Sequence, residues 1–190
     1  MMSCEKKSDI VTNSKDYNDF LELNDNKSID FAKNEIDFWQ EKFDASPNQI
    51  TYLSQIASNY SKLFEITGTI QYLVKAEELL LKSNEAFRYT QVGTIRSLAR
   101  NYITQHRFKE ALVLANKALE IGEGMKETQK LLFDVQMELG NYKEAKELFQ
   151  KSLMAYENYY GKDHIEVARL MKQLADIYLL EGQLDLAEDY

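Results

Sequence analysis

The chain contains very little cysteine, proline and histidine. Its 190 residues include one cysteine, one proline and two histidines, which are Cys4, Pro47, His106 and His164. A single cysteine excludes an internal disulfide and a cysteine-based zinc site, and two histidines are too few for a histidine metal cluster. One proline and seven glycines are typical of a chain in which little lies outside helices. We therefore expect neither a metal nor a cofactor.

The sequence also lacks a long apolar run and an excess of positive charge. No run approaches the roughly 20 apolar residues that a membrane-crossing helix needs. The formal net charge is −8, which argues against non-specific binding to nucleic acid or to anionic membranes. A hydrophobic content of 44% with 28% charged residues indicates a folded chain rather than a disordered one.

Catalytic signatures are missing as well. The chain has no Gly-rich phosphate loop, no HExxH and no Gly-x-Ser-x-Gly sequence, and each of these marks a known reaction chemistry. His106 occupies the turn position that Gly140 and Gly182 take in later parts of the chain, which predicts an exposed turn histidine. His164 lies beside an expected helix start, as a capping or packing residue would. We do not expect an enzyme.

The informative feature that is present is a recurring spacing. Alanine and tyrosine recur in one register, at Ala99, Tyr102, Ala111 and Ala118, and again at Ala175, Tyr178 and Ala187. Between them, Phe133, Ala145 and Ser152 stand 34 residues after Ala99, Ala111 and Ala118. Self-similarity with a period near 34 residues is typical of stacked helical hairpins. Small residues at these positions let two antiparallel helices approach closely. The expected fold is an all-α, right-handed solenoid of helical hairpins.

The spacing divides the chain into a leader and a solenoid. Residues 1–28 are polar, with an amphipathic patch at Tyr17, Phe20 and Leu21 that predicts a short helix in a tether. The solenoid is expected over 29–190, as a partial repeat 29–49, repeats 50–91, 92–125 and 126–160, and a truncated repeat 161–190. Helix caps are expected at Ser28, Thr69 and Asp163, and breaks at Gly68, Gly122 and Gly124.

The pattern resembles the tetratricopeptide repeat. Residues 92–125 carry it most fully, through Leu98, Ala99, Tyr102, Phe108, Ala111 and Ala118. In 126–160, Gln136 replaces the family's usual aromatic residue and Phe133 its usual small residue. The stretch Tyr160-Gly161-Lys162-Asp163-His164 is similar to the longer repeats of kinesin light chains, with Ile165 in place of their proline. The resemblance implies an interaction scaffold with an extended binding surface.

Alignment of the first helices places charged residues on the expected concave face. They are Arg96, Arg100, Lys130, Asp134, Arg169, Lys172 and Asp176. A basic row in an acidic protein predicts that the groove binds another protein through an acidic or carboxylate-ended segment. The alternative is a set of i,i+4 pairs worth about 0.2–0.5 kcal/mol each on an ordinary helix surface. The asparagine-rich carboxylate clamp of some chaperone-binding family members is not seen.

The expected function is thus a non-enzymatic scaffold that binds a partner segment in its groove. One alternative is a signalling regulator whose repeats change curvature when they bind a peptide or a small effector. Another is an accessory subunit of an enzyme. Compaction on ligand binding, measured by small-angle scattering, would distinguish a regulator from a passive scaffold.

The two ends of the chain add two expectations. Ser3-Cys4 followed by polar residues resembles the end of a bacterial lipoprotein signal, which would anchor the protein to the cell envelope by lipidation of Cys4 and requires an apolar signal encoded upstream. The alternative is an incidental cytosolic thiol. At the other end, Leu184 and Ala187 begin an apolar helix, which predicts either a longer protein or dimerisation through that end.

Overall fold

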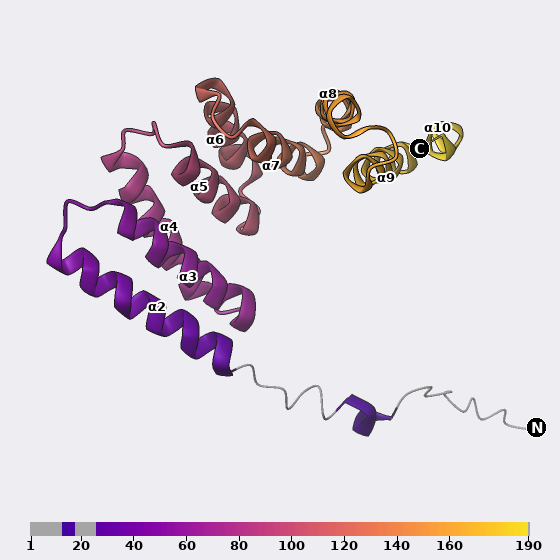
Figure 1. Cartoon of the computed structure of the whole chain (residues 1–190). Coiled ribbons are helices and arrows are strands. Elements are labelled where there is room, and N and C mark those ends of the chain that lie inside the picture. Colours follow the sequence, from indigo (N-terminus) through magenta and orange to yellow (C-terminus); the bar gives the residue numbers. More distant parts are fainter. Residues whose placement is uncertain (1–12, 18–25, 190) are drawn as a thin grey trace, which may run out of the picture.

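The computed structural model describes residues 13–17 and 26–189, and within them every regular element is a helix (Figure 1). The elements are η1 (Ser14–Tyr17), α2 (Asn26–Ala45), α3 (Thr51–Thr67), α4 (Ile70–Ala86), α5 (Val92–Thr104), α6 (Phe108–Ile121), α7 (Met125–Glu138), α8 (Tyr142–Tyr160), α9 (Ile165–Leu180) and α10 (Leu184–Glu188). The predicted all-α solenoid is confirmed. Cys4, Phe20, Leu21 and Tyr190 lie outside the described residues.

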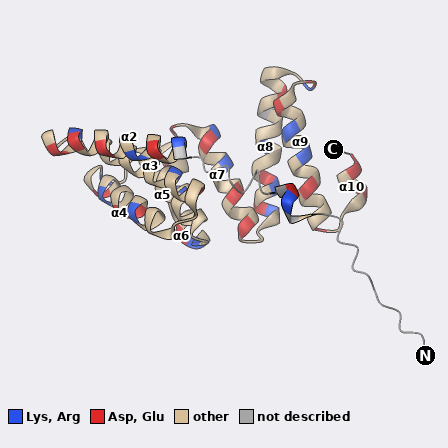
Figure 2. Ribbon diagram, turned by 90° about the horizontal axis from the view of Figure 1, so that it is seen from below, with Lys and Arg blue, Asp and Glu red and all other residues tan. Residues whose placement is uncertain are grey.

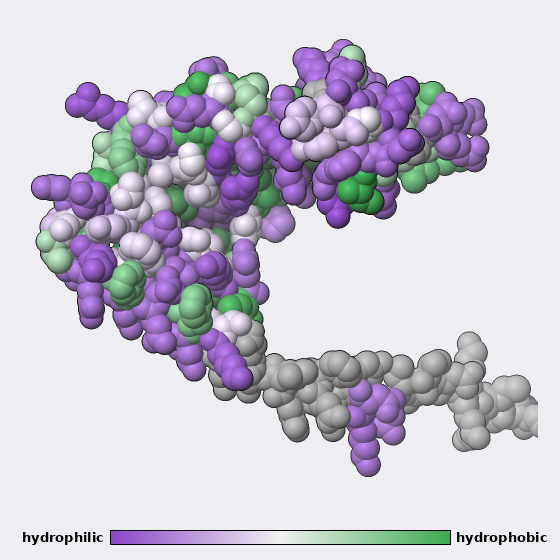
Figure 3. All heavy atoms as spheres, viewed as in Figure 1, coloured by the Kyte–Doolittle hydropathy of each residue, from purple (hydrophilic) through white to green (hydrophobic). Residues whose placement is uncertain are grey.

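Each helix from α2 to α10 packs against the next one along the chain. Short connections force neighbouring helices to run antiparallel, so the elements form a row of hairpins. The row curves like a hook, with α2–α4 in one arm and α8–α10 in the other (Figure 1). The space-filling view shows a hollow between the two arms (Figure 3). Among the described helices, none combines the length and apolar character that a bilayer crossing requires.

Glycine ends several helices where the sequence predicts a break. Gly68 has a φ of +66° and donates its N–H to the carbonyl of Phe64 at 2.7 Å. Gly122 ends α6 with a φ of +83°, and Gly124 precedes α7 with a φ of +56°. A residue without a Cβ takes up this left-handed backbone without steric cost. The predicted breaks at Gly68, Gly122 and Gly124 are therefore confirmed.

Two predicted helix caps are wrong. Ser28 lies inside α2, because that helix begins at Asn26. The N-cap of α9 is His164 rather than Asp163, and its Nδ1 accepts a hydrogen bond from the N–H of Glu166 at 3.2 Å. Thr69 does occupy the N-cap position of α4, but its side chain makes no capping hydrogen bond.

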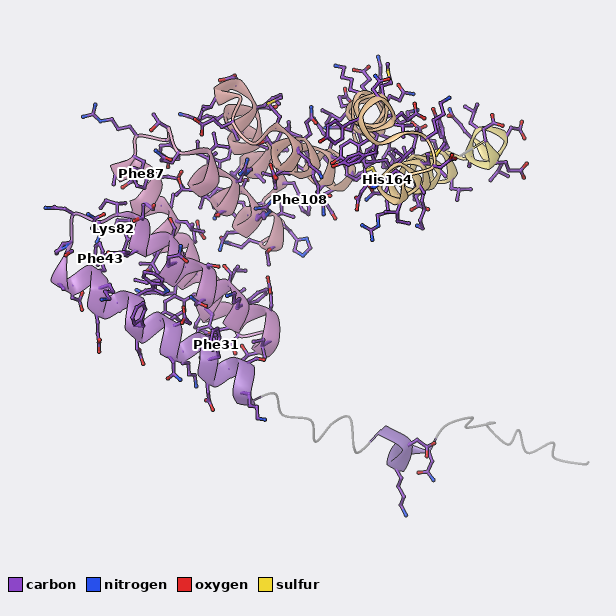
Figure 4. All side chains as sticks on the ribbon, in the orientation of Figure 1. Phe31, Phe43, Lys82, Phe87, Phe108 and His164 are labelled. Atoms are coloured by element: carbon purple, nitrogen blue, oxygen red, sulfur yellow. The ribbon has the colours of Figure 1, made fainter. Side chains whose placement is uncertain are left out.

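The core contains the alanines that recur at fixed spacings in the sequence. Ala99, Ala111, Ala118 and Ala145 have no exposed surface, and larger apolar side chains fill the space between hairpins. Lys82 adds an outer contact between α4 and α2, with its ammonium 5.3 Å from the ring centre of Phe43 (Figure 4). Close approach of the alanines holds the hairpins in a compact stack.

Two of the clusters of buried side chains meet at α7. Leu131, Leu132 and Val135 face α5 and α6 and belong to the central cluster. Phe133 faces the other way, into a second cluster with Phe149 and the buried residues of α9. Helix α7 is thus the element shared by the two halves of the solenoid, and its groove-facing side positions the candidate site.

Candidate binding groove

A cavity of about 680 Å³ lies among α7, α8 and α9, with Arg100 of α5 at its edge. Its apolar part is made by Phe133, Leu148, Phe149 and Leu170. Its charged part comprises five basic residues and two acidic ones, namely Arg100, Lys126, Lys130, Arg169, Lys172, Glu127 and Glu166. The lining is therefore net positive in a protein whose formal net charge is −8. Figure 2 shows that α7, α8 and α9 each carry both basic and acidic residues.

The structure brings four of the seven predicted groove residues to this cavity. Arg100, Lys130, Arg169 and Lys172 line it. They come from α5, α7 and α9, the first helices of three successive hairpins, which are the helices expected to carry the groove. Arg96, Asp134 and Asp176 are not among its lining residues.

The two basic residues on α9 are already paired with carboxylates of their own helix. Arg169 donates to Glu166 at 2.6 Å, and Lys172 donates to Asp176 at 2.8 Å. All four side chains remain largely in contact with solvent, where such pairs contribute about 0–1 kcal/mol to stability. Their charge toward an incoming anion is partly neutralised.

Arg100 and Lys130 differ from the two basic residues of α9 in their partners. Both are exposed, and within the described residues neither side chain donates a hydrogen bond or forms an ion pair. Their carboxylate neighbour is Asp134, whose pKa is raised because burial disfavours its charged form, although the positive charges of Lys130 and Arg100 act against this shift. The α5–α7 side of the cavity thus holds two cations that are free to meet an anion.

Arg96 holds the backbone at the start of α7. Its guanidinium donates to the carbonyl of Gly124 at 2.9 Å and also contacts Thr128 Oγ1 at 3.3 Å and the carbonyl of Glu123 at 3.4 Å. A Cβ at Gly124 would come within 2.3 Å of the Arg96 Nη1 atom. This geometry uses Arg96 to join α5 to the α6–α7 connection.

Lys126 and Tyr156 are among the cavity residues that sequence reasoning missed. Lys126 lies with its ammonium 4.9 Å from the ring centre of Tyr156, and its interaction with that phenol raises the pKa of Lys126. The signal for Lys126 was available, because it stands one helical turn before Lys130 on the same face. Tyr156 lies on α8, a second helix of a hairpin, which the alignment of first helices did not consider.

His106 lies in a turn and His164 lies at the start of a helix. His106 has a φ of +57° at the turn between α5 and α6, where Gly140 and Gly182 have a φ of +73° in later turns. It is exposed, as the sequence predicts. His164 caps α9 and stacks on Tyr160 with ring centres 4.4 Å apart at the end of α8 (Figure 4). Both predictions for His164, capping and packing, are confirmed.

Comparison with known proteins identifies the repeat type. Residues 131–190 match the family model of the tetratricopeptide repeat. The sequence matches none of the curated proteins. The family model therefore confirms the predicted tetratricopeptide repeats in residues 131–190. For the rest of the solenoid the support is the likeness of its fold to solved structures.

Several solved structures share the fold at low identity. Kinesin light chain-type, nearly identical TPR-like repeats from Podosopora anserina match at 16% identity and a TM-score of 0.68, covering 86% of this chain and 89% of that one. MamA matches at 17% identity and a TM-score of 0.64, covering 82% and 81%. BtubC from P. vanneervenii matches at 17% identity and a TM-score of 0.63, covering 85% and 68%. The fold is a tetratricopeptide-repeat solenoid, an architecture that generally serves non-catalytic protein interaction.

Proposed function

We propose that this protein is a non-enzymatic scaffold that binds an acidic segment of a partner protein in the cavity between α7 and α9. The observation that carries the proposal is the pair Arg100 and Lys130, two exposed cations that form no ion pair within the described residues and lie beside the apolar part of the cavity. Carboxylates of the partner would meet these cations, and an apolar side chain would cover Phe133 and Leu170. Arg169 and Lys172 add weaker attraction because each is paired on its own helix.

The remaining predicted residues take supporting roles in this proposal. Arg96 fixes the connection before α7 and so sets the position of Lys130. Asp134 and Asp176 limit the positive charge on each side of the cavity, since each follows its lysine by one helical turn. A groove of this mixed composition suits a single linear segment, with a dissociation constant on the order of micromolar.

Charge reversal tests the proposal. A fluorescein-labelled peptide of alternating glutamate and leucine is titrated with the wild type, with R100E/K130E, and with a matched control, K109E/K143E, whose lysines are exposed and lie outside the cavity. We expect the groove variant to lose at least tenfold in affinity and the control to stay within twofold. Wild-type binding should weaken with added salt, because exposed charges are screened over roughly 8–10 Å. Equal losses in both variants would contradict a groove site.

The separation of the two core clusters at α7 favours a second candidate, a regulator whose curvature responds to the ligand. Helices α5 and α7 pack directly on each other, whereas α7 and α9 are joined mainly through α8. An anion held between α7 and α9 would draw these two helices together. Small-angle scattering with and without the acidic peptide tests this, and an unchanged radius of gyration would favour the passive scaffold.

Lipid anchoring through Cys4 is a separate proposal, supported by the sequence Ser3-Cys4 and the polar residues after it. It would place the scaffold at a bacterial cell envelope and give it contact with a membrane through the anchor alone. Mass spectrometry of the native protein should find a diacyl or triacyl modification on Cys4. A native protein that retains Met1 would rule this proposal out.

A further inference from the structure

A second cavity adjoins the basic one and shares Arg100 with it. This cavity, of about 240 Å³, lies among α3, α4 and α5. Its polar lining is dominated by hydroxyl groups, from Ser54, Ser58, Ser61, Ser97 and Thr104. Because Arg100 lines both cavities, the two form consecutive parts of one groove along α3, α5, α7 and α9.

Three of the five hydroxyl groups present acceptors rather than donors. Ser61 donates its hydrogen to the carbonyl of Ala57 at 3.1 Å, and Ser97 donates to the carbonyl of Gly93 at 3.0 Å. Thr104 donates to the carbonyl of Arg100 at 3.0 Å. A hydroxyl has one hydrogen and two lone pairs, so a hydroxyl that donates within its own helix offers only its oxygen to a ligand. At Ser61, Ser97 and Thr104 this part of the groove therefore favours N–H donors.

The two cavities also differ in charge. The charged residues of the second cavity are Glu65 and Arg100, which balance each other. The first cavity has five basic residues against two acidic ones. Carboxylates would gain less in the second cavity, where Glu65 offsets Arg100, than among five cations, and a neutral donor would gain little in the first cavity. Each cavity thus favours a different kind of side chain.

We propose that the groove binds one extended segment in two parts, an acidic stretch in the first cavity and an uncharged stretch rich in serine, asparagine and glutamine in the second. The inference rests on the proposed function, because it extends the same site. Arg100 lies at the junction, where its guanidinium contacts the last carboxylate of the acidic stretch. The amide N–H groups of the uncharged stretch donate to Ser61, Ser97 and Thr104.

The geometry sets a minimum length for the segment. Directly packed helices lie about 8–10 Å apart, so a segment that crosses from α3 over α5 and α7 to α9 spans at least roughly 24–30 Å. An extended chain advances about 3.3 Å per residue. The bound segment therefore has at least about seven to nine residues, and a shorter acidic peptide occupies the first cavity alone.

The experiment compares peptides of two lengths. The short probe is labelled Glu-Asp-Glu-Asp, and the long probes carry the extension Gly-Asn-Ser-Gln-Asn at the C-terminus or its reverse at the N-terminus. Two variants of the second cavity are used: S58F fills it from an exposed position, and S61A/S97A/T104V removes the acceptors while keeping its shape. Circular dichroism and thermal melts confirm folding of each variant.

We expect one of the two long probes to bind at least tenfold more tightly than the short one. In S58F and in the acceptor-free variant that gain should disappear while affinity for the short probe stays within twofold. An extension that adds less than twofold, or a gain that survives in both variants, would overturn the inference and leave the acidic site intact. Failure of every probe to bind would overturn the proposed function together with the inference.

Discussion

The ring of Phe133 stands edge-on to the ring of Phe149, with centroids 4.0 Å apart and planes inclined at 76°. Phe133 lies on α7 and Phe149 on α8, and both are buried. A small residue would usually occupy the position of Phe133 in a tetratricopeptide repeat. The larger ring fills the contact between these helices and forms part of the apolar lining of the cavity. A departure from the repeat pattern thus helps to build the binding site.

Replacing Phe133 with alanine should destabilise the C-terminal half of the solenoid. Loss of a buried phenylalanine costs about 3–5 kcal/mol, because both burial and ring contacts are lost. Urea unfolding followed by circular dichroism measures this, with F133L as a control that keeps most of the apolar volume. A loss below about 1 kcal/mol in F133A would contradict the role given to this ring pair.

Arg96 and Arg100 provide a matched pair for separating structure from binding. They lie one helical turn apart on α5, yet Arg96 holds the backbone of Gly124 and Arg100 lines both cavities. We expect R96A to lower the free energy of unfolding by about 1–2 kcal/mol, since hydrogen bonds to a charged donor are lost. R100A should leave it within about 0.5 kcal/mol and weaken acidic peptide binding instead. If R100A lowers stability and R96A weakens only binding, the roles given to Arg96 and Arg100 are wrong.

The sequence predicted the architecture well because helix packing leaves a strong periodic signal. The register of Ala99, Ala111 and Ala118 reflects close approach of helices, and all three are fully buried. Glycine at Gly68 and Gly122 predicted chain breaks because the left-handed backbone strongly favours this residue. These are local constraints that a single sequence records directly.

The candidate site was predicted only in part, because side-chain partners depend on tertiary geometry. Register alone placed Arg96 beside Arg100, but could not show that the loop before α7 brings the carbonyl of Gly124 to the Arg96 guanidinium. Likewise, Tyr156 lines the cavity from α8. Alignment of the sequence predicted binding residues on the first helices alone, and α8 is the second helix of its hairpin. The sequence offered both Asp163 and His164 as caps of α9, because both residues precede the helix and only geometry selects His164.

His106 offers a test of backbone strain. It holds a φ of +57° at a turn where later hairpins use glycine, and a left-handed conformation costs a residue with a Cβ roughly 1–2 kcal/mol. Replacing His106 with glycine should therefore raise the free energy of unfolding by about 0.5–1 kcal/mol, after the greater entropy loss of glycine is taken into account. Thermal melts measure the change, and G140A, which introduces the same strain at a later turn, should have the opposite sign.

Asp134 should make stability depend on pH in a direction set by its burial. Burial raises the pKa of this carboxyl above its ordinary value of 3.8 in spite of Lys130 and Arg100. At pH 7 the unfolded chain carries the ionised group, and partial burial makes that charge less favourable in the folded chain, so the group lowers stability there. Below the ordinary pKa the group is protonated in both states, and this cost vanishes.

Replacing Asp134 with asparagine should therefore raise the melting temperature at pH 7. The gain should shrink as the pH falls toward 4, because the wild-type carboxyl takes up its proton in the folded state first. Asp176, exposed and paired with Lys172 at 2.8 Å, supplies the control. D176N should not raise the melting temperature at any of the pH values tested. Melts of the three proteins at pH 4, 5.5 and 7 decide the matter. A D134N gain that does not change with pH would show that its origin is packing rather than the buried charge.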